Sequence, residues 1–151
     1  MEPHDQITGV VVDAAYKLHT KLGPGLIESV YEILLARMLE ERGLKVDRQK
    51  PIAIEFDGIK LPDAFRVDLL VEDRVVVELK ALESLAPVHV RQTVTYLRLL
   101  DQPVGLLINF GAAKLKDGLR RISNSRASCY EPEFASSAHE GEHLPAAGIA
   151  L

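Results

Sequence analysis

The N-terminal part of the chain carries two runs in which apolar residues recur every three or four positions. A stripe of this kind predicts an amphipathic helix. The first run covers residues 5–21 and ends at Gly23-Pro24-Gly25, because glycine and proline interrupt helices. The second run extends to about Arg42, with Gly43 as its C-terminal stop. The stripes consist of Ile7, Val10, Val11, Ala14, Ala15 and Leu18 in the first helix, and Ile27, Val30, Tyr31, Leu34, Leu35, Met38 and Leu39 in the second.

After the second predicted helix, the period of the apolar pattern shortens toward two, which is typical of β-strands. Residues 51–56 alternate, and Asp57-Gly58 behind them is the strongest short signal for a hairpin turn. Residues 59–71 predict the return strand, Glu72-Asp73 a tight turn, and residues 74–81 a third strand. We therefore expect three antiparallel strands in succession.

A further helix and strand complete the predicted core. Pro87 stands where a helix can begin, and an apolar stripe continues from it to about Leu100. The short apolar segment 104–109 predicts a buried central strand, and residues 114–122 predict a short closing helix. The resulting order is αβββαβ with an extra N-terminal helix. This order predicts an α/β fold in which helices pack around a small mixed sheet.

The size and composition of the chain favour a single domain. The chain has 151 residues, of which 47% are hydrophobic, and this excludes a wholly disordered chain. We assign the domain to residues 1–122. Residues 123–151 are rich in Ser, Ala, Glu, Gly and Pro without a sustained period, so they predict a poorly ordered C-terminal tail.

Charge and cysteine content narrow the classes of function. Acidic residues outnumber basic ones, 22 to 18, which argues against a protein that coats nucleic acid through Lys and Arg alone. An enzyme that holds a cation between carboxylates remains compatible, because the metal supplies positive charge. The lone Cys129 excludes an internal disulfide or a thiolate cluster, and no apolar run approaches the roughly 20 residues of a membrane span. We therefore expect a cytoplasmic protein with no membrane partner.

The segment 65–80 contains the candidate chemistry. Alternate side chains of a strand share a face, so Val76, Glu78 and Lys80 point in the same direction. If the predicted turn after residue 71 closes a hairpin, Asp68 on the preceding strand lies about level with Glu78. Two carboxylates in a mostly buried sheet repel each other unless a cation lies between them.

The residues alone leave two interpretations open. The first is a magnesium site, because hard divalent cations bind carboxylate and carbonyl oxygens and keep waters that a phosphate can displace. Lys80 would then orient a water or stabilise negative charge on that phosphate. The second is a cross-strand salt bridge in which Lys80 pairs with Glu78 or Asp68. Gln92 and Tyr96, four residues apart on the next helix, either contact a phosphate backbone or are ordinary surface and core-edge residues.

These residues together resemble a known superfamily. Asp68, then Glu78-Leu79-Lys80 and then Gln92-x-x-x-Tyr96 resemble the PD-(D/E)XK nuclease superfamily, and the last element is similar to its RecB-type branch. The segment Gly25-Leu26-Ile27-Glu28-Ser29-Val30-Tyr31 resembles the motif that names the GxxExxY protein family. Segments 22–25, 77–81 and 105–111 are also similar to that family. The resemblance covers about residues 7–122 and leaves out the tail.

The resemblance implies a restriction-endonuclease-like core and a set of metal ligands. Asp68 and Glu78 would bind Mg²⁺ or Mn²⁺ through their carboxylates, and Leu79 would bind it through its backbone carbonyl. Glu28 would correspond to the acid that the first core helix of the superfamily often contributes to the metal site. A proline often precedes the Asp in the superfamily, and Val67 stands there in this chain.

The resemblance also implies roles for four further residues. Lys80 would be the catalytic lysine, and Gln92 and Tyr96 would support the substrate and the geometry of the active site. His19 either corresponds to a histidine that lies upstream of the Asp in the RecB-type branch or is structural. Its position before the Gly23-Pro24-Gly25 break leaves both alternatives open.

These inferences lead to one functional hypothesis and one alternative. The hypothesis is a metal-dependent nuclease that hydrolyses phosphodiester bonds in nucleic acid, with DNA favoured over RNA by analogy with the family. The alternative is a non-catalytic binding or assembly module on the same scaffold. A homodimer, or a partner protein that supplies specificity, fits either function.

Overall fold

The computed structural model describes residues 3–124, and the predicted tail from residue 125 onward lies outside them. None of the helices in this range is long and apolar enough to cross a membrane. The elements are α1 (Pro3–Leu22), α2 (Glu28–Glu41), β1 (Val46–Phe56), β2 (Ile59–Val71), β3 (Val75–Lys80), α3 (Pro87–Leu100), β4 (Val104–Asn109), α4 (Leu115–Gly118) and β5 (Leu119–Ser123).

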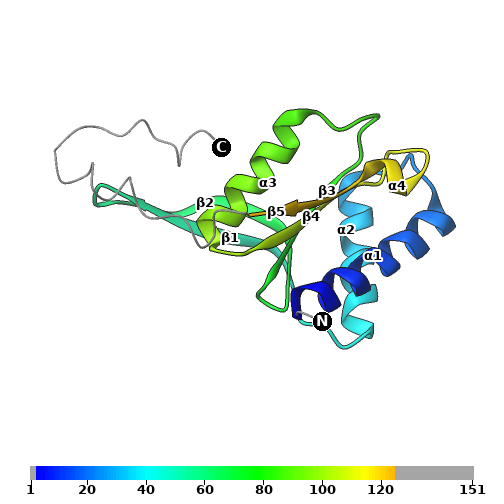
Figure 1. Ribbon diagram of the computed structural model, residues 1–151, viewed down its shortest axis with the longest axis horizontal. Helices are drawn as coiled ribbons and strands as arrows, with labels where there is room; N and C mark the ends of the chain where they lie inside the picture. Colours follow the sequence, from blue (N-terminus) through cyan, green and yellow to red (C-terminus); the bar gives the residue numbers. More distant parts are fainter. Residues whose placement is uncertain (1–2, 125–151) are drawn as a thin grey trace.

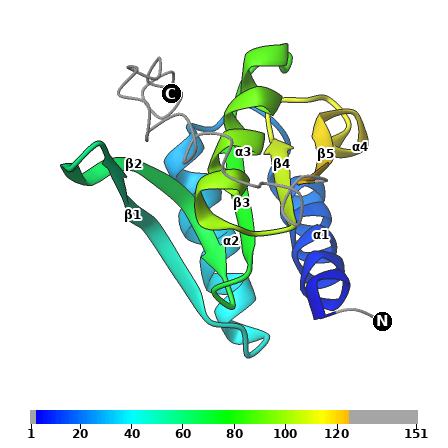
Figure 2. The same ribbon diagram turned by 60° about the vertical axis from the view of Figure 1, so that its left-hand side comes forward.

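The strands form one mixed sheet in the order β1-β2-β3-β4-β5. Neighbouring strands are antiparallel except β3 and β4, which run parallel. Parallel neighbours need a crossover connection, and α3 supplies it by lying across one face of the sheet (Figures 1 and 2). The predicted αβββαβ core with an extra N-terminal helix is therefore confirmed.

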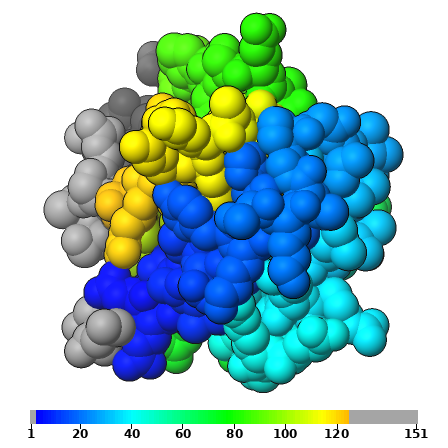
Figure 3. All heavy atoms as spheres, turned by 90° about the vertical axis from the view of Figure 1, so that its right-hand side faces the viewer, coloured from blue at the N-terminus to red at the C-terminus, as the bar shows by residue number. Residues whose placement is uncertain are grey.

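Helices cover both faces of the sheet and create two hydrophobic cores. One core lies between the sheet and the α1/α2 layer, in which the two helices pack side by side (Figure 3). The other core lies between the sheet and α3. In β3, Val77 and Leu79 belong to the first core and Val76 to the second. Because Glu78 and Lys80 alternate with the first pair, they share a face with Val76, as the alternation predicted, and the structure shows that this face is the α3 side.

The connection between α1 and α2 is held by Tyr31, which is fully buried. Its hydroxyl donates a hydrogen bond to the Gly23 carbonyl at 2.5 Å and accepts one from the Leu26 N–H at 3.2 Å. The ring stacks on Phe110 with centroids 4.6 Å apart. These contacts determine where α2 begins, and therefore where Glu28 in its first turn lies.

The β1–β2 hairpin projects beyond the helical layers (Figures 1 and 2). Asp57 and Gly58 have φ values of 49° and 76°, which is the left-handed conformation that a two-residue hairpin turn requires. β1 begins at Val46, five residues before the predicted start at residue 51. Pairing with β2 extends the strand through polar residues 48–50, which lack a strand-like apolar period.

The predicted closing helix at residues 114–122 is wrong for its second half. α4 ends at Gly118, and residues 119–123 form β5 alongside β4. A Cβ at Gly118 would lie 2.5 Å from the Asn109 carbonyl oxygen, so the chain turns closely against β4 here. Pairing with β4 satisfies the backbone groups of β5, and this tertiary contact overrides the local preference for helix.

The Asn109 side chain holds the chain immediately after β3 through hydrogen bonds. Its Oδ1 accepts hydrogen bonds from the N–H groups of Leu82 at 2.8 Å and Gly111 at 3.1 Å, and its Nδ2 donates to the Leu82 carbonyl at 2.9 Å. A Cβ at Gly111 would lie 2.2 Å from that carbonyl oxygen. Only glycine fits this approach, which restrains the chain two residues after Lys80.

We expect Gly111→Ala to lower the free energy of unfolding by about 1–3 kcal/mol, because the added methyl group displaces the backbone at Leu82. Gly9→Ala is the matched control, since Gly9 is exposed in α1 and no atom lies within 4 Å of an added Cβ. This control is expected to gain up to about 1 kcal/mol from the higher helix propensity of alanine. Urea unfolding measures both variants, and equal stabilities would contradict the close approach.

Candidate active site

The candidate site lies where the antiparallel pairing between β2 and β3 ends. Leu69 and Val77 form the last described pair on this side, and Asp68 and Glu78 stand at the next level, as predicted. The Asp68 N–H donates to Glu78 Oε1 at 3.1 Å, and the Leu79 N–H donates to Asp68 Oδ2 at 2.8 Å. Two side-chain carboxylates therefore accept the backbone hydrogen bonds at the end of this strand pair.

The Leu79 carbonyl points toward β2, on the same side of β3 as the Leu79 N–H. The N–H and C=O of one strand residue point to the same side of the strand, and the Leu79 N–H points toward Asp68 on β2. The carbonyl of the next residue, Lys80, points the other way and accepts a hydrogen bond from the Phe110 N–H at 2.8 Å. The described β2–β3 pairs end at Leu69 and Val77. The Leu79 carbonyl therefore faces β2 beyond the last described pair, on the side of β3 where Asp68 lies.

Glu78 is buried, with 5% of its surface exposed. Burial raises the pKa of its carboxyl well above the usual range, and the charge of Asp68 raises it further. The hydrogen bond from the Asp68 N–H and the charge of Lys80 act in the opposite direction. The ionised form of Glu78 is therefore unfavourable in the metal-free protein, and a cation near Asp68 would favour it.

Glu28 approaches this pair from the first turn of α2. Burial raises the pKa of its carboxyl, the charge of Asp68 raises it further, and the charge of Lys80 lowers it. Within residues 3–124, however, no three His, Cys, Asp or Glu side chains come close enough to form a ready metal cluster. The structure thus joins Asp68 and Glu78 directly, and it brings Glu28 close enough to respond to the charge of Asp68.

Lys80 is partly exposed at the end of β3, where it lines a groove of about 630 Å³ beside α3. In the described part of the chain it forms no ion pair. The cross-strand salt bridge that the residues alone allowed is therefore absent from residues 3–124. The ammonium group is available to a ligand in the groove.

Tyr96 and Gln92 reach the site from α3. Tyr96 is buried, and its ring stacks on Phe65 with centroids 4.4 Å apart. Burial, followed by the charges of Glu78 and Asp68, raises the pKa of its hydroxyl to about 12, while the Gln92 side chain opposes the shift. Tyr96 therefore stays protonated at neutral pH and can donate a hydrogen bond, and Gln92 lines the groove with Lys80.

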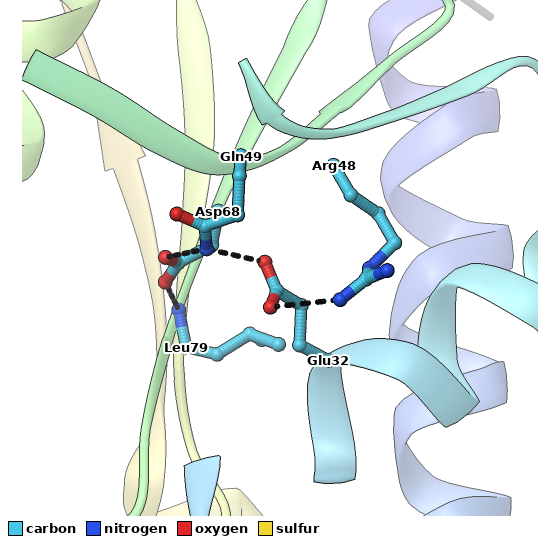
Figure 4. A network of polar contacts seen from close by, with 5 residues as sticks. All are labelled: Glu32, Arg48, Gln49, Asp68 and Leu79. Carbon is cyan, nitrogen blue, oxygen red and sulfur yellow. Dashed lines mark hydrogen bonds and ion pairs between the residues drawn. The ribbon is translucent and has the colours of Figure 1, made fainter. Parts of the chain in front are cut away.

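Gln49 and Glu32, to which the sequence assigned no role in the site, join it. Gln49 of β1 donates from its amide to Glu32 at 2.6 Å and to Asp68 at 3.2 Å, and Arg48 donates to the other oxygen of Glu32 at 3.4 Å (Figure 4). Glu32 could have been noticed, because it follows Glu28 by four residues and so shares its helix face. Gln49 belongs to the polar run 48–50, which by itself indicates either a basic rim for phosphate or a solvated entry to the strand, and neither interpretation predicts its contact with Asp68.

His19 contributes to a different part of the fold. Its Nε2 lies 2.8 Å from the Ala112 carbonyl oxygen, so the ring links α1 to the chain after β4. The ring is also tilted against Phe110, with centroids 6.5 Å apart. These contacts favour the structural alternative for His19.

The donor set of the site fits a hard divalent cation. The carboxylates of Asp68 and Glu78 each accept a backbone hydrogen bond where the β2–β3 pairing ends, the Leu79 carbonyl lies on the β2 side of its strand, and all three groups offer oxygen. Mg²⁺ and similar cations prefer such ligands to nitrogen or sulfur. The mutual repulsion of the two acids is the feature that a bound cation would remove.

We expect Glu78→Gln to raise the free energy of unfolding of the metal-free protein by on the order of 1 kcal/mol, because the amide removes the buried charge and keeps an oxygen for the Asp68 N–H. Glu55→Gln is the control, since Glu55 is exposed on β1, and it is expected to stay within about 0.5 kcal/mol. Urea unfolding in EDTA measures both changes.

The same comparison has a defined pH dependence. Because the pKa of Glu78 is raised in the folded state, the native protein holds this proton more tightly than the unfolded chain. Stability therefore falls as the pH rises from the ordinary glutamate range through the raised pKa. Glu78→Gln lacks this part of the slope, and parallel curves for the two proteins would contradict the electrostatics described above.

Comparison with known proteins identifies the family. A family model described as the PD-(D/E)XK nuclease superfamily matches residues 5–122, a range that contains every candidate site residue. No curated protein and no solved structure gives a significant match to the chain. Members of the superfamily are typically nucleases, and they generally use Mg²⁺ or Mn²⁺. Since the match spans most of its length, the chain belongs to the PD-(D/E)XK nuclease superfamily.

Proposed function

We propose that this protein is a metal-dependent nuclease that hydrolyses phosphodiester bonds in nucleic acid, with DNA as the substrate. The observation that carries the proposal is the adjacent pair of the half-buried Asp68 and the buried Glu78 where the β2–β3 pairing ends, next to a Lys80 that forms no ion pair in the described chain. Membership of the superfamily supports nuclease chemistry, and the choice of DNA rests on analogy with it.

The residues that would hold the cation are Asp68, Glu78 and the Leu79 carbonyl, with Glu28 as an additional ligand. Bound Mg²⁺ or Mn²⁺ would lower the pKa of a coordinated water and offset the charge of the phosphate. The electrostatic support for Glu28 is that its carboxyl responds to the charges of both Asp68 and Lys80.

The remaining groups act on the water and the phosphate. Hydrolysis forms one P–O bond to the water oxygen and breaks another, and it leaves a phosphate on one fragment and a hydroxyl on the other. The Lys80 ammonium orients the water or offsets charge that develops on the phosphate oxygens. Tyr96, which stays protonated, and Gln92 are donors that position this lysine and the phosphate.

The N-terminal motif supports a finer assignment to the GxxExxY branch. Gly25 has a φ of 114°, a conformation that suits glycine and permits the turn before α2. The carboxyl of Glu28, three residues later, responds to the charges of Asp68 and Lys80. The Tyr31 hydroxyl holds the turn by donating a hydrogen bond to the Gly23 carbonyl. Gly25 and Tyr31 thus hold the turn that positions the Glu28 carboxylate, and this is a physical reason for the G-x-x-E-x-x-Y spacing.

The groove beside α3 is the proposed path of the nucleic-acid backbone. Arg91 and Arg98 line it with Lys80, and their spacing of seven residues puts them on one face of α3. Both are exposed, and neither forms an ion pair within residues 3–124. Unpaired cations along a groove attract phosphates even though the chain as a whole is acidic.

The first test is cleavage of end-labelled single-stranded and double-stranded DNA with Mg²⁺, Mn²⁺ or EDTA. We expect metal-dependent cleavage by the wild type, and a loss of about 100-fold or more in Glu78→Ala and in Lys80→Ala. Lys60→Ala, an exposed lysine on the hairpin, is the matched control and should cleave like the wild type.

Each result of this experiment has a distinct meaning. Equal cleavage by the wild type and Glu78→Ala would place the activity elsewhere or in a contaminant. Binding of DNA without cleavage in any metal would favour the non-catalytic module. Normal turnover by Lys80→Ala would remove this lysine from the mechanism while leaving the metal site intact.

The second test concerns the groove. We expect the double variant Arg91→Ala/Arg98→Ala to bind DNA at least tenfold more weakly at low salt, and to show a salt dependence smaller by about 1.4 in slope for a single strand, because two phosphate contacts are lost. Arg74→Ala is the control, since Arg74 is exposed at the β2–β3 turn, away from the groove. Fluorescence anisotropy in EDTA measures binding without cleavage, and unchanged affinity would exclude this path.

A further inference from the structure

Gln49 bridges two carboxylates with a single amide group. Its Nε2 donates to Glu32 Oε1 at 2.6 Å and to Asp68 Oδ1 at 3.2 Å (Figure 4). A primary amide has two hydrogens on nitrogen and none on oxygen, so both donors are used here. The flipped amide would turn its oxygen toward two carboxylates, and the orientation of the Gln49 side chain is therefore determined by its neighbours.

This bridge completes the restraint of Asp68. The Oδ2 of Asp68 accepts the Leu79 N–H, and its Oδ1 accepts the Gln49 amide. Two hydrogen bonds on different oxygens hold the plane of the carboxylate. Because an ionised carboxylate has about four acceptor positions, each oxygen still has one available for a cation.

Glu32 anchors Gln49 from the helical layer. It lies one turn after Glu28 in α2, and its side chain is only 6% exposed. Its second oxygen accepts a hydrogen bond from Arg48, the residue before Gln49. A buried acid on α2 thus holds two consecutive residues of β1, and through Gln49 it acts on the carboxylate of Asp68.

The backbone at this point departs from regular strand geometry. Gln49 has a φ of 50°, a conformation that a residue with a side chain adopts at a cost of about 1–3 kcal/mol. The described β1–β2 pairs lie on either side of Gln49 and Asp68 and leave these two residues out. Val67 packs in the α3-side core and Leu69 in the α1/α2-side core, so β2 changes its inward face at Asp68. The strain is located at the residue that contacts Asp68.

We propose that Gln49 is a positioning residue, whose amide, anchored by the buried Glu32, holds the Asp68 carboxylate in the orientation that a divalent cation requires. The inference rests on the proposed function, since it assumes that Asp68 binds metal. It goes further by assigning a role to β1 and to the Glu28-to-Glu32 face of α2. Groups that orient metal ligands typically change metal affinity by about 10–100-fold when they are removed.

The test measures binding of Mn²⁺ alone, by the electron paramagnetic resonance signal of the free ion, with no nucleic acid present. We expect Gln49→Gly to weaken Mn²⁺ binding at least tenfold while its stability in urea stays equal or rises, because glycine relieves the left-handed backbone. A merely structural glutamine would instead lose stability. Gln102→Ala is the matched control, since the Gln102 amide bonds the Asp73 carbonyl at the β2–β3 turn, and its Mn²⁺ affinity should be unchanged.

Two further variants separate the possible outcomes. Asp68→Asn should abolish Mn²⁺ binding, and Glu32→Gln combined with Gln49→Gly should bind no more weakly than Gln49→Gly alone, because both changes break the same bridge. If Asp68→Asn loses binding and Gln49→Gly does not, the positioning role is overturned and the proposed function stands. If the wild type binds no Mn²⁺, the metal-dependent function fails, and the positioning role fails with it.

Discussion

The structure depends on the point at which β2 and β3 stop pairing through their backbones. Beyond Leu69 and Val77, the N–H groups of Asp68 and Leu79 bond to side-chain carboxylates instead of strand carbonyls. Buried backbone donors must find partners, so the same requirement that shapes a sheet brings two acids together inside it. The Leu79 carbonyl lies on the same side of β3 as its N–H, and the proposed metal site is built on that arrangement.

The elements around this proposed site restrain the groups that border it. Tyr31 holds the turn before α2 by a hydrogen bond to the Gly23 carbonyl, and its ring stacks on Phe110. These contacts determine the position of Glu28 in the first turn of α2. Asn109, at the end of the parallel neighbour β4, forms hydrogen bonds with the backbone of Leu82, and these restrain the end of the strand that carries Lys80. Restraint of this kind keeps the functional groups aligned without a ligand.

The features that lower the stability of the metal-free protein lie close to this end of the β2–β3 pairing. Glu78 is a buried acid with a raised pKa, and Gln49, which contacts the neighbouring Asp68, has a strained backbone. Neither feature helps the metal-free fold, and the two packed cores on either side of the sheet offset their cost. Local conflict surrounded by consistent packing is the pattern expected where a site has been shaped for binding rather than for stability.

The sequence by itself determined the elements whose causes are local. Apolar periodicity predicted the helices and strands, the Glu72-Asp73 turn set Asp68 level with Glu78, and alternation along β3 put Lys80 on the same face as Glu78. Only the tertiary structure decided that residues 119–123 form a strand and that Gln49 meets Asp68. These features arise from pairing and packing between distant segments, which supply backbone partners and buried acids that no local pattern encodes.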